Sequence, residues 1–354
     1  MKSLLKRILG GGFGIMMSCA SGFAAEPAKP TLATIDYAGL AFQPKTWKER
    51  GMDTQMTVWP GKEIVFLVQP GSYEPALMKR WVDHLDQGWA LYRELTGRSP
   101  RLFKQVANQP MIAAVPAGGF TCGAGCGYVG STGIELAMFH SHNYQALKAD
   151  PDAMPHYVYY EMGRNYYTFG DRHSCFTTGF AVFMRYVCMD TVGCKDTDST
   201  TRRTIESLEP LFKKRKLDFI GLFTNSAGVG EKGHRIKDDQ GRTISPSDQP
   251  CTYASAMMRL HRECGGNDWL KRFFAQLALC AEVKPISPEA ARTQCWNWML
   301  CASLAAQRDL SSIFADDWGL PIHAETRNQL AKVDWKDASL DVTKLAGAVT
   351  PRWK

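Results

Sequence analysis

Residues 156–169, HYVYYEMGRNYYTF, gather polar side chains that could do chemistry on one predicted helix. Glu161 could move a proton, and Arg164 could stabilise negative charge on a bound group. His156 could share in the proton transfer, and the Tyr160 phenol could donate a hydrogen bond. Residues four apart lie on one helix face, so we expect His156, Tyr160 and Arg164 together, with Glu161 at their margin. These four are the catalytic candidates.

The pentad from Tyr160 to Arg164 has the spacing of H-E-x-x-H. In that pattern two histidines one helical turn apart share one Zn²⁺, and the glutamate polarises the metal-bound water. Only the glutamate, Glu161, is present here. A phenol must lose a proton near about pH 10 to bind a metal well, and a guanidinium has no lone pair to offer. We therefore expect no metal and no other cofactor at this helix.

Two uses of these residues remain open without zinc. Arg164 follows Glu161 by three residues, so a salt bridge between them could stiffen the fold and do no chemistry. Alternatively, Arg164 and the tyrosine rings could bind a peptide carboxylate or an acidic glycan. The candidates for substrate binding beside them are Tyr128, Tyr167 and Thr178.

A weaker metal hypothesis concerns His140 and His142, which lie at the end of a predicted strand. In extended backbone, residues i and i+2 point to the same side, so this pair could chelate a metal. The alternative is that both are ordinary surface histidines near a loop.

The first 24 residues predict a secretory signal peptide, with Lys2, Lys6 and Arg7 before an apolar stretch and cleavage near Ala24. Acylation at Cys19 is an alternative fate of this segment. No other apolar stretch reaches the roughly 18 residues that a membrane span needs, so we expect no transmembrane segment. The predicted location is the periplasm or the outside of the cell.

Eleven cysteines occur, ten of them after the predicted cleavage site. An even number in an oxidising compartment predicts several disulfide bonds. Cys122 and Cys126, in a tight glycine-rich loop, are the pair that the sequence indicates, with a zinc knuckle as the alternative. Cys175, Cys188 and Cys194 flank the second helix and are expected to staple it.

The formal net charge is +7, of which three cations lie in the signal segment, so the mature chain carries about +4. The dense basic run at 213–216 suits the end of a helix. We therefore expect no nucleic-acid partner. No Ser-His-Asp order, phosphate-binding glycine loop or nucleotide fingerprint supports a serine hydrolase or a Rossmann oxidoreductase.

Hydrophobic periodicity predicts the elements that position the candidate residues. Strands are expected at 63–68, 111–115, 127–130 and 134–139, and a long helix at 75–96 that ends at Gly97. The candidate helix follows at 156–169. Beyond it the pattern is helical, at 177–190, 201–223, 253–264, 269–279, 288–307 and 326–333, with a polar hairpin near 234–244.

Four local motifs occur in order between residues 60 and 330: YRELTGRSP at 92–100, YVGSTGIEL at 128–136, TGFAVFMR at 178–185, and RDLSSIF with WGLP within 308–321. Their types and order resemble the gluzincin zinc metallopeptidases, particularly the secreted mucin-active or enhancin-like branch and the plant basic secretory proteins. The resemblance implies that Tyr160 and Arg164 stand where the zinc histidines would be, and Thr178 where the third ligand would be. It also implies that the strand around Tyr128 binds extended substrate.

The resemblance implies an α+β, zincin-like fold. We expect a mixed-sheet α/β lobe with the active-site helix at 61–175 and a mostly helical lobe at 176–354. These would follow the signal peptide at 1–24 and an irregular segment at 25–60.

We therefore expect a secreted metallopeptidase-like protein that is a pseudoenzyme as a zinc peptidase. It would bind a peptide, a glycoprotein or a wall polysaccharide in the cleft between its lobes. The alternative is a metal-independent hydrolase or lyase that uses Glu161 with Tyr160 and Arg164. A purely structural protein, with a filled cleft, is the third class.

Overall fold

The computed structural model describes residues 35–116, 123–170, 174–210, 219, 223, 248–283, 288–349 and 351–353, which belong to one compact unit. The predicted signal peptide, the basic run at 213–216 and the polar hairpin at 234–244 lie outside the described residues.

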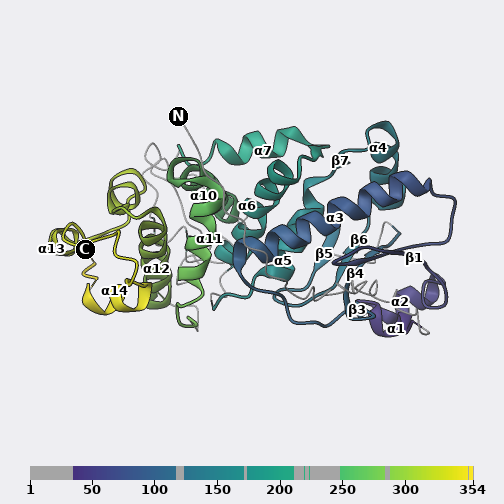
Figure 1. Ribbon diagram of the computed structural model, residues 1–354, viewed down its shortest axis with the longest axis horizontal. Helices are drawn as coiled ribbons and strands as arrows, with labels where there is room; N and C mark the ends of the chain where they lie inside the picture. The colour runs from purple at the N-terminus through teal and green to yellow at the C-terminus, as the bar shows by residue number, and fades with distance from the viewer. Residues whose placement is uncertain are drawn as a thin grey trace, which may run out of the picture. The chain divides into compact units, whose positions relative to one another are not determined.

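A mixed sheet forms the N-terminal part of this unit (Figure 1). Its spatial order is β1 (Thr57–Pro60), β2 (Val65–Val68), β4 (Gln109–Ala114), β6 (Ile134–Leu136) and β5 (Gly125–Gly127), and the short β3 (Gln105–Val106) pairs with β4. Strands β2, β4 and β6 are parallel, whereas β1 and β5 run antiparallel to their neighbours.

Both faces of the sheet are buried, as the unbroken apolar run in β2 predicts. Alternate residues of β2 point to opposite faces: Phe66 joins the larger core, and Leu67 joins a smaller cluster around Trp47. On the smaller cluster's side lie α1 (Tyr37–Leu40) and α2 (Pro44–Glu49). The expectation of an irregular segment is therefore wrong for residues 35–60, because a proline-started helix buries Trp47 there.

The larger core is covered by α3 (Pro75–Thr96), which ends at a left-handed Gly97 with φ of 63°, as predicted. After β6 the chain forms a π-helical turn η1 (Phe139–Asn143), then α4 (Tyr144–Ala149), the short β7 (Ala153–Met154) and α5 (His156–Tyr166). Strand β8 (Lys195–Asp196) pairs in parallel with β7.

The rest of the described chain is mostly helical, which confirms the predicted α+β class with a mixed sheet first and helices after it. The elements are α6 (Ser174–Val192), α7 (Ser199–Glu206), α10 (Asp248–Cys264), α11 (Gly266–Leu277), α12 (Pro288–Ala306), the π-helical η2 (Ile313–Asp317), α13 (Ala324–Leu330) and α14 (Val342–Ala348). In the described part of the chain, no helix has both the length and the apolar character to cross a membrane.

Helix α6 links the two parts, because it packs against α5 on one side and α10 on the other. Two glycines permit these close approaches. A Cβ on Gly163 of α5 would lie 2.8 Å from the Cα of Ala181, and a Cβ on Gly179 of α6 would lie 2.5 Å from the ring of Tyr253. One hydrophobic cluster therefore continues from the sheet into the C-terminal helices.

Candidate functional site

Helix α5 carries the candidate residues, and its apolar stripe fixes its orientation. Val158, Met162 and Tyr166 are fully buried, as their spacing predicts. Strand β5 crosses the helix at Glu161 with two glycines, and a Cβ on Gly127 would lie 2.6 Å from the Glu161 carbonyl oxygen. Glycine at this position is therefore what lets the last strand of the described sheet lie directly against the helix.

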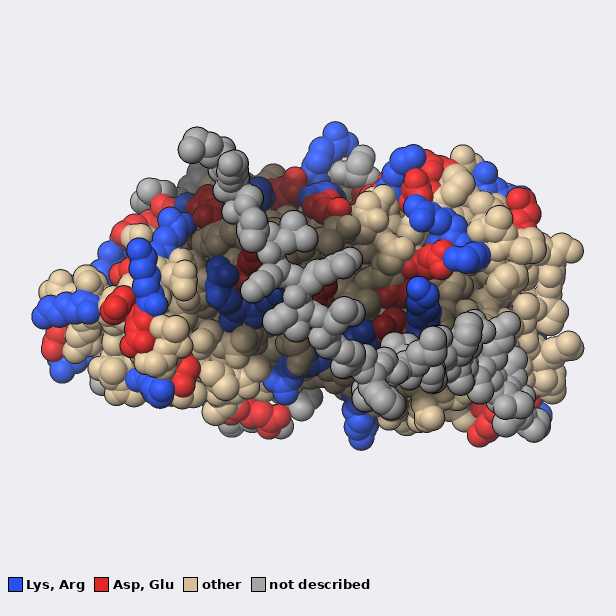
Figure 2. Space-filling model, viewed as in Figure 1, with Lys and Arg blue, Asp and Glu red and all other residues tan. Residues whose placement is uncertain are grey.

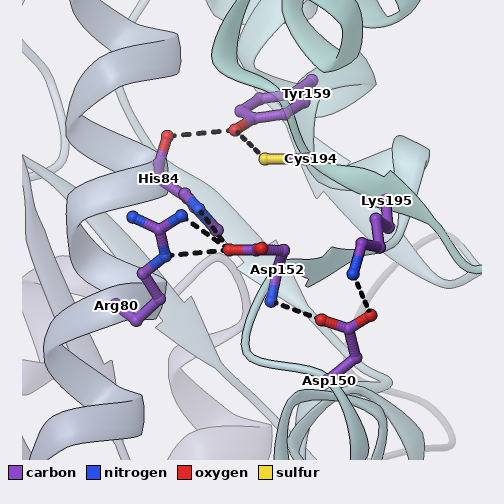
Figure 3. Close-up of polar contacts among 7 residues, drawn as sticks. All are labelled: Arg80, His84, Asp150, Asp152, Tyr159, Cys194 and Lys195. Atoms are coloured by element: carbon purple, nitrogen blue, oxygen red, sulfur yellow. Dashed lines mark hydrogen bonds and ion pairs between the residues drawn. The ribbon is translucent and has the colours of Figure 1, made fainter.

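A polar cluster holds the first half of α5 against α3 and the β7–β8 pair (Figure 3). The Tyr159 hydroxyl donates to the His84 carbonyl oxygen at 3.0 Å and lies 3.3 Å from the Cys194 sulfur. Arg80 donates to Asp152 at 2.6 Å, and the His84 ring lies 3.9 Å from the same carboxylate. Tyr159 thus joins α5 to α3 through the backbone of His84.

Glu161 is almost completely buried, with 6% of its surface exposed. Burial raises the pKa of its carboxyl to about 7, although the nearby Arg164 charge and a hydrogen bond from the Gly127 backbone act to lower it. A carboxyl with a pKa close to neutral pH can both hold and release a proton under ordinary conditions.

Tyr160, Arg164 and Thr178, which the resemblance assigns to ligand positions, lie together. The Arg164 guanidinium donates to the Thr178 hydroxyl at 3.3 Å, which joins α5 to α6. Burial raises the pKa of Tyr160, and the neighbouring Arg164 charge and Thr178 side chain lower it by less. The guanidinium of Arg185, also from α6, lies 5.9 Å from the centre of the Tyr160 ring.

These residues do not fit a zinc ion. A phenol whose pKa is raised stays protonated, the guanidinium offers only donors, and a lone hydroxyl is a weak ligand. Among the described residues, no group of three or more His, Cys, Asp or Glu side chains is arranged to hold a metal ion.

The salt bridge expected between Glu161 and Arg164 is not formed. The two charges interact at a distance, but the guanidinium of Arg164 turns to Thr178 and makes no ion pair with any carboxylate among the described residues. The reason is that helix spacing only permits such a pair, and the hydroxyl on α6 supplies a competing acceptor. In the part of the chain that the structure describes, Arg164 is therefore a half-buried cation without an anionic partner.

His156 is the first residue of α5, and its contacts are with α6 and the segment around β8. Its ring lies 3.8 Å from the Asp198 carboxylate and 5.8 Å from the Tyr186 ring. Burial and the Arg185 charge lower its pKa, whereas Asp196 and Asp198 act to raise it. None of its contacts is with Glu161.

Two of the three substrate-binding candidates pack with other aromatic rings. Tyr128 follows β5, and its ring lies 4.3 Å from Phe42, on the opposite face of the sheet from Glu161. The last strand of the described sheet is β5 (Gly125–Gly127), so the strand predicted at 127–130 is misplaced. Tyr167 is 4% exposed and packs against Phe180 at 5.4 Å, which places its ring in the core.

The geometry on which the His140 and His142 hypothesis depends is wrong. Both lie in η1, a helical turn, where residues i and i+2 point in different directions. The His140 ring points inward, 3.4 Å from the Tyr73 hydroxyl, while exposed His142 contacts Ser141. The strand ends earlier than predicted, at Leu136.

The cysteine predictions have a mixed outcome. Cys126 is disulfide-bonded, and Cys122, with which the sequence pairs it, lies outside the described residues. The expected staple through Cys188 and Cys194 is wrong, because both are free thiols. They face different groups: Cys194 lies beside the Tyr159 hydroxyl, and the Cys188 sulfur lies 3.9 Å from the Gly88 carbonyl oxygen.

Sequence reasoning missed two residues beside the site. Arg185 is 7% exposed and lies between the rings of Tyr160 and Tyr186. Its signal was a single charge within an apolar helical run. Tyr157, one turn before Glu161, has its pKa raised to about 12 by burial and receives a hydrogen bond from Asn143.

The face seen in Figure 2 is hollowed across its middle, in the part of the view where Figure 1 places α5, α6 and α11, and side chains of both charges lie in the hollow.

Comparison with known proteins gives structural neighbours at low similarity. No protein-family model and no curated protein matches the chain. A functionally unknown conserved protein from Bacillus anthracis is 14% identical over 81% of this chain, with a TM-score of 0.49. A metallopeptidase from Bacteroides thetaiotaomicron and a metallopeptidase in complex with Tn antigen are each 12% identical over 79% of it, with TM-scores of 0.45 and 0.44.

The chain spans about half the length of these neighbours, 54%, 44% and 48% respectively.

Proposed function

We propose that the residues around Glu161 form a zinc-independent binding site for an extended, carboxylate-bearing segment of a peptide or glycoprotein. The observation that carries this proposal is the state of Arg164. The residue is half-buried, and its guanidinium donates to Thr178 and has no carboxylate partner among the described residues. A partly desolvated guanidinium is well suited to a carboxylate, because its planar donors match the two oxygens.

The sheet supports the same proposal. Strand β5 is the last strand of the described sheet and lies against Glu161 through Gly125 and Gly127. Proteins that bind extended peptides often do so by adding a strand at a sheet edge, where main-chain hydrogen bonds give affinity. A peptide beside β5 would bring its side chains near Tyr160 and Arg164.

One observation favours a second function, metal-independent proton transfer. The pKa of Glu161 is raised to about 7, which is where a general acid or base works best at neutral pH. In this alternative, Glu161 moves the proton and Arg164 stabilises the negative charge of a hydrolase or lyase reaction.

The binding proposal is tested with alanine pentapeptides, acetylated at the N-terminus and amidated at the C-terminus, that carry one aspartate or glutamate at each position in turn. Counterparts with asparagine or glutamine have the same shape without the charge. We expect acidic peptides to bind at least about tenfold more tightly than their amide counterparts, and Arg164→Ala to remove that difference.

Arg203→Ala is the matched control, because Arg203 is an exposed arginine on α7. The affinity of this variant for the acidic peptides should equal that of the wild type. Equal affinity of acidic and amide peptides, or full affinity in Arg164→Ala, would refute the binding proposal. Peptide turnover that survives chelation and is lost in Glu161→Gln would establish the second function.

A further inference from the structure

A groove lies between α12 and α14, in a different part of the chain from Glu161. Two cavities, of about 500 and about 340 Å³, share the lining residues Glu289, Thr293, Asn297 and Ala346. Pockets that hold small ligands measure roughly 300–1,000 Å³. Because the two cavities share these residues, we treat them as one feature, the α12–α14 groove.

The walls of the groove combine hydrogen-bonding groups with an aromatic end. Glu289, Thr293 and Asn297 follow one another at one-turn intervals along α12. At the end nearer the C-terminus stands the half-exposed Trp353, 5.8 Å from the ring of buried Trp296 and steeply inclined to it. The groove therefore offers amide, hydroxyl and carboxylate groups and a tryptophan ring.

Three residues of α12 in or beside the groove have buried polar atoms with no hydrogen-bond partner among the described residues. Gln294 is 4% exposed, and neither its amide oxygen nor its amide nitrogen makes a hydrogen bond. It lines a recess of about 20 Å³ that also includes Asn297 of the groove, a size that can hold one bridging water. The Nε of Arg292 and the indole N–H of Trp296 are also unpartnered. Leaving such groups unsatisfied costs free energy, which a bound ligand or water that pairs with them would recover.

The kinds of groups present identify the ligand chemistry. Amide side chains both donate and accept, as a sugar hydroxyl does, and an indole ring covers the apolar C–H face of a sugar ring. Glu282 and Glu289 bring carboxylates to the groove and Arg292 brings a guanidinium. These groups accept hydrogen bonds from sugar hydroxyls or donate to them, which requires no charge on the ligand. We propose that the α12–α14 groove binds a neutral sugar ring or a short neutral oligosaccharide. This site does not depend on Arg164 or on the function proposed for it.

The test uses the methyl glycosides of glucose, galactose, mannose, N-acetylglucosamine and N-acetylgalactosamine. Binding is followed by saturation-transfer NMR and by titration of tryptophan fluorescence. We expect at least one glycoside to bind at millimolar concentration, with affinity about tenfold or more weaker in both Trp353→Ala and Asn297→Ala. Asn297→Asp keeps nearly the same side-chain shape, so it separates loss of the amide group from a folding defect. Far-UV circular dichroism shows whether each variant remains folded.

Phe103→Ala is the matched control, because Phe103 is an aromatic side chain that is 47% exposed outside the groove. It should bind the glycoside as tightly as the wild type. Failure of all five glycosides to bind would overturn the proposal. Equal affinity in folded Trp353→Ala and Asn297→Ala would do so too, as would binding of a neutral alanine pentapeptide in the groove without any sugar.

Discussion

Glu161 and Arg164 lie one turn apart on α5, but their side chains contact different parts of the molecule. Glu161 is buried against the glycines of β5, whereas Arg164 reaches across to Thr178 on α6. The sequence predicts which residues occupy these positions, because helical spacing and the motif order locate them. It does not predict that the two side chains fail to pair, because that depends on an acceptor from another helix.

The raised pKa of Glu161 predicts a pH-dependent stability. In the folded protein the pKa is about 7, against a usual value of 4.5, so the folded state binds the proton more tightly. The contribution is fully present below about pH 4.5 and is lost as the pH rises to about 7. Relative to Glu161→Gln, the wild type should therefore lose on the order of 3 kcal/mol of unfolding free energy across this window.

Urea unfolding at intervals between pH 4 and pH 8 measures this loss as a difference between wild type and variant. Glu135, on the opposite face of the sheet, also has its pKa raised to about 7 by burial. Glu135→Gln is therefore the comparison variant. It should remove the part of the pH dependence of the unfolding free energy that comes from Glu135. If wild type and Glu161→Gln show parallel stability curves, the account of Glu161 is wrong.

At the scale of elements, the long helices follow from the sequence and the short elements do not. Helix α3 has the predicted bounds because its apolar stripe is long and Gly97 ends it. Strand β5 has no hydrophobic pattern from which it could be predicted, because it consists of Gly125, Cys126 and Gly127. Its two glycines are required by the close approach to Glu161 of α5. The π-helical turn at Phe139–Asn143 likewise follows an apolar run that suggested a longer strand.

Contact between α5 and α6 depends on Gly163. An alanine there would place its Cβ 2.8 Å from the Cα of Ala181, so the helices would have to separate. We expect Gly163→Ala to lower the free energy of unfolding by about 1–3 kcal/mol and to weaken ligand binding at Arg164, because Thr178 would move away. Thermal and urea unfolding measure the first effect.

Gly347→Ala supplies the control, because a Cβ at Gly347 in α14 would contact nothing within 4 Å. It should be neutral or stabilising by up to about 1 kcal/mol. Equal behaviour of the two variants would contradict the close packing of α5 on α6.

Tyr159 provides a milder test of how α5 is held. Tyr159→Phe keeps the buried ring but removes the hydrogen bond to the His84 carbonyl oxygen. We expect a loss of about 1 kcal/mol in unfolding free energy and no change in secondary structure by circular dichroism. A change below about 0.3 kcal/mol would show that this hydrogen bond does not help to hold the helix.

At the scale of the whole molecule, the sheet and the helical part share one core. A single cluster contains Phe66 of β2, Met162 of α5, Phe180 of α6, Trp298 of α12 and Leu345 of α14. The sequence suggested two lobes because its pattern changes from mixed to helical near α6. Periodicity describes each element alone and does not show that α6 is buried by packing on both sides.

This continuity predicts that the two parts unfold together. Thermal unfolding followed by far-UV and near-UV circular dichroism should give one transition with the same midpoint in both signals. Two separated transitions, of which only one shifts to lower temperature in Gly163→Ala, would show that the two parts are independent domains.

The central claim is that Arg164 and its neighbours recognise a ligand without zinc. The most direct measurement is the affinity for the tightest acidic pentapeptide, before and after treatment of the protein with a chelator, in the wild type and in Arg164→Ala. The account predicts the same wild-type affinity in both conditions and a loss of about tenfold or more in Arg164→Ala. Binding that disappears with the chelator and returns with added zinc would contradict it.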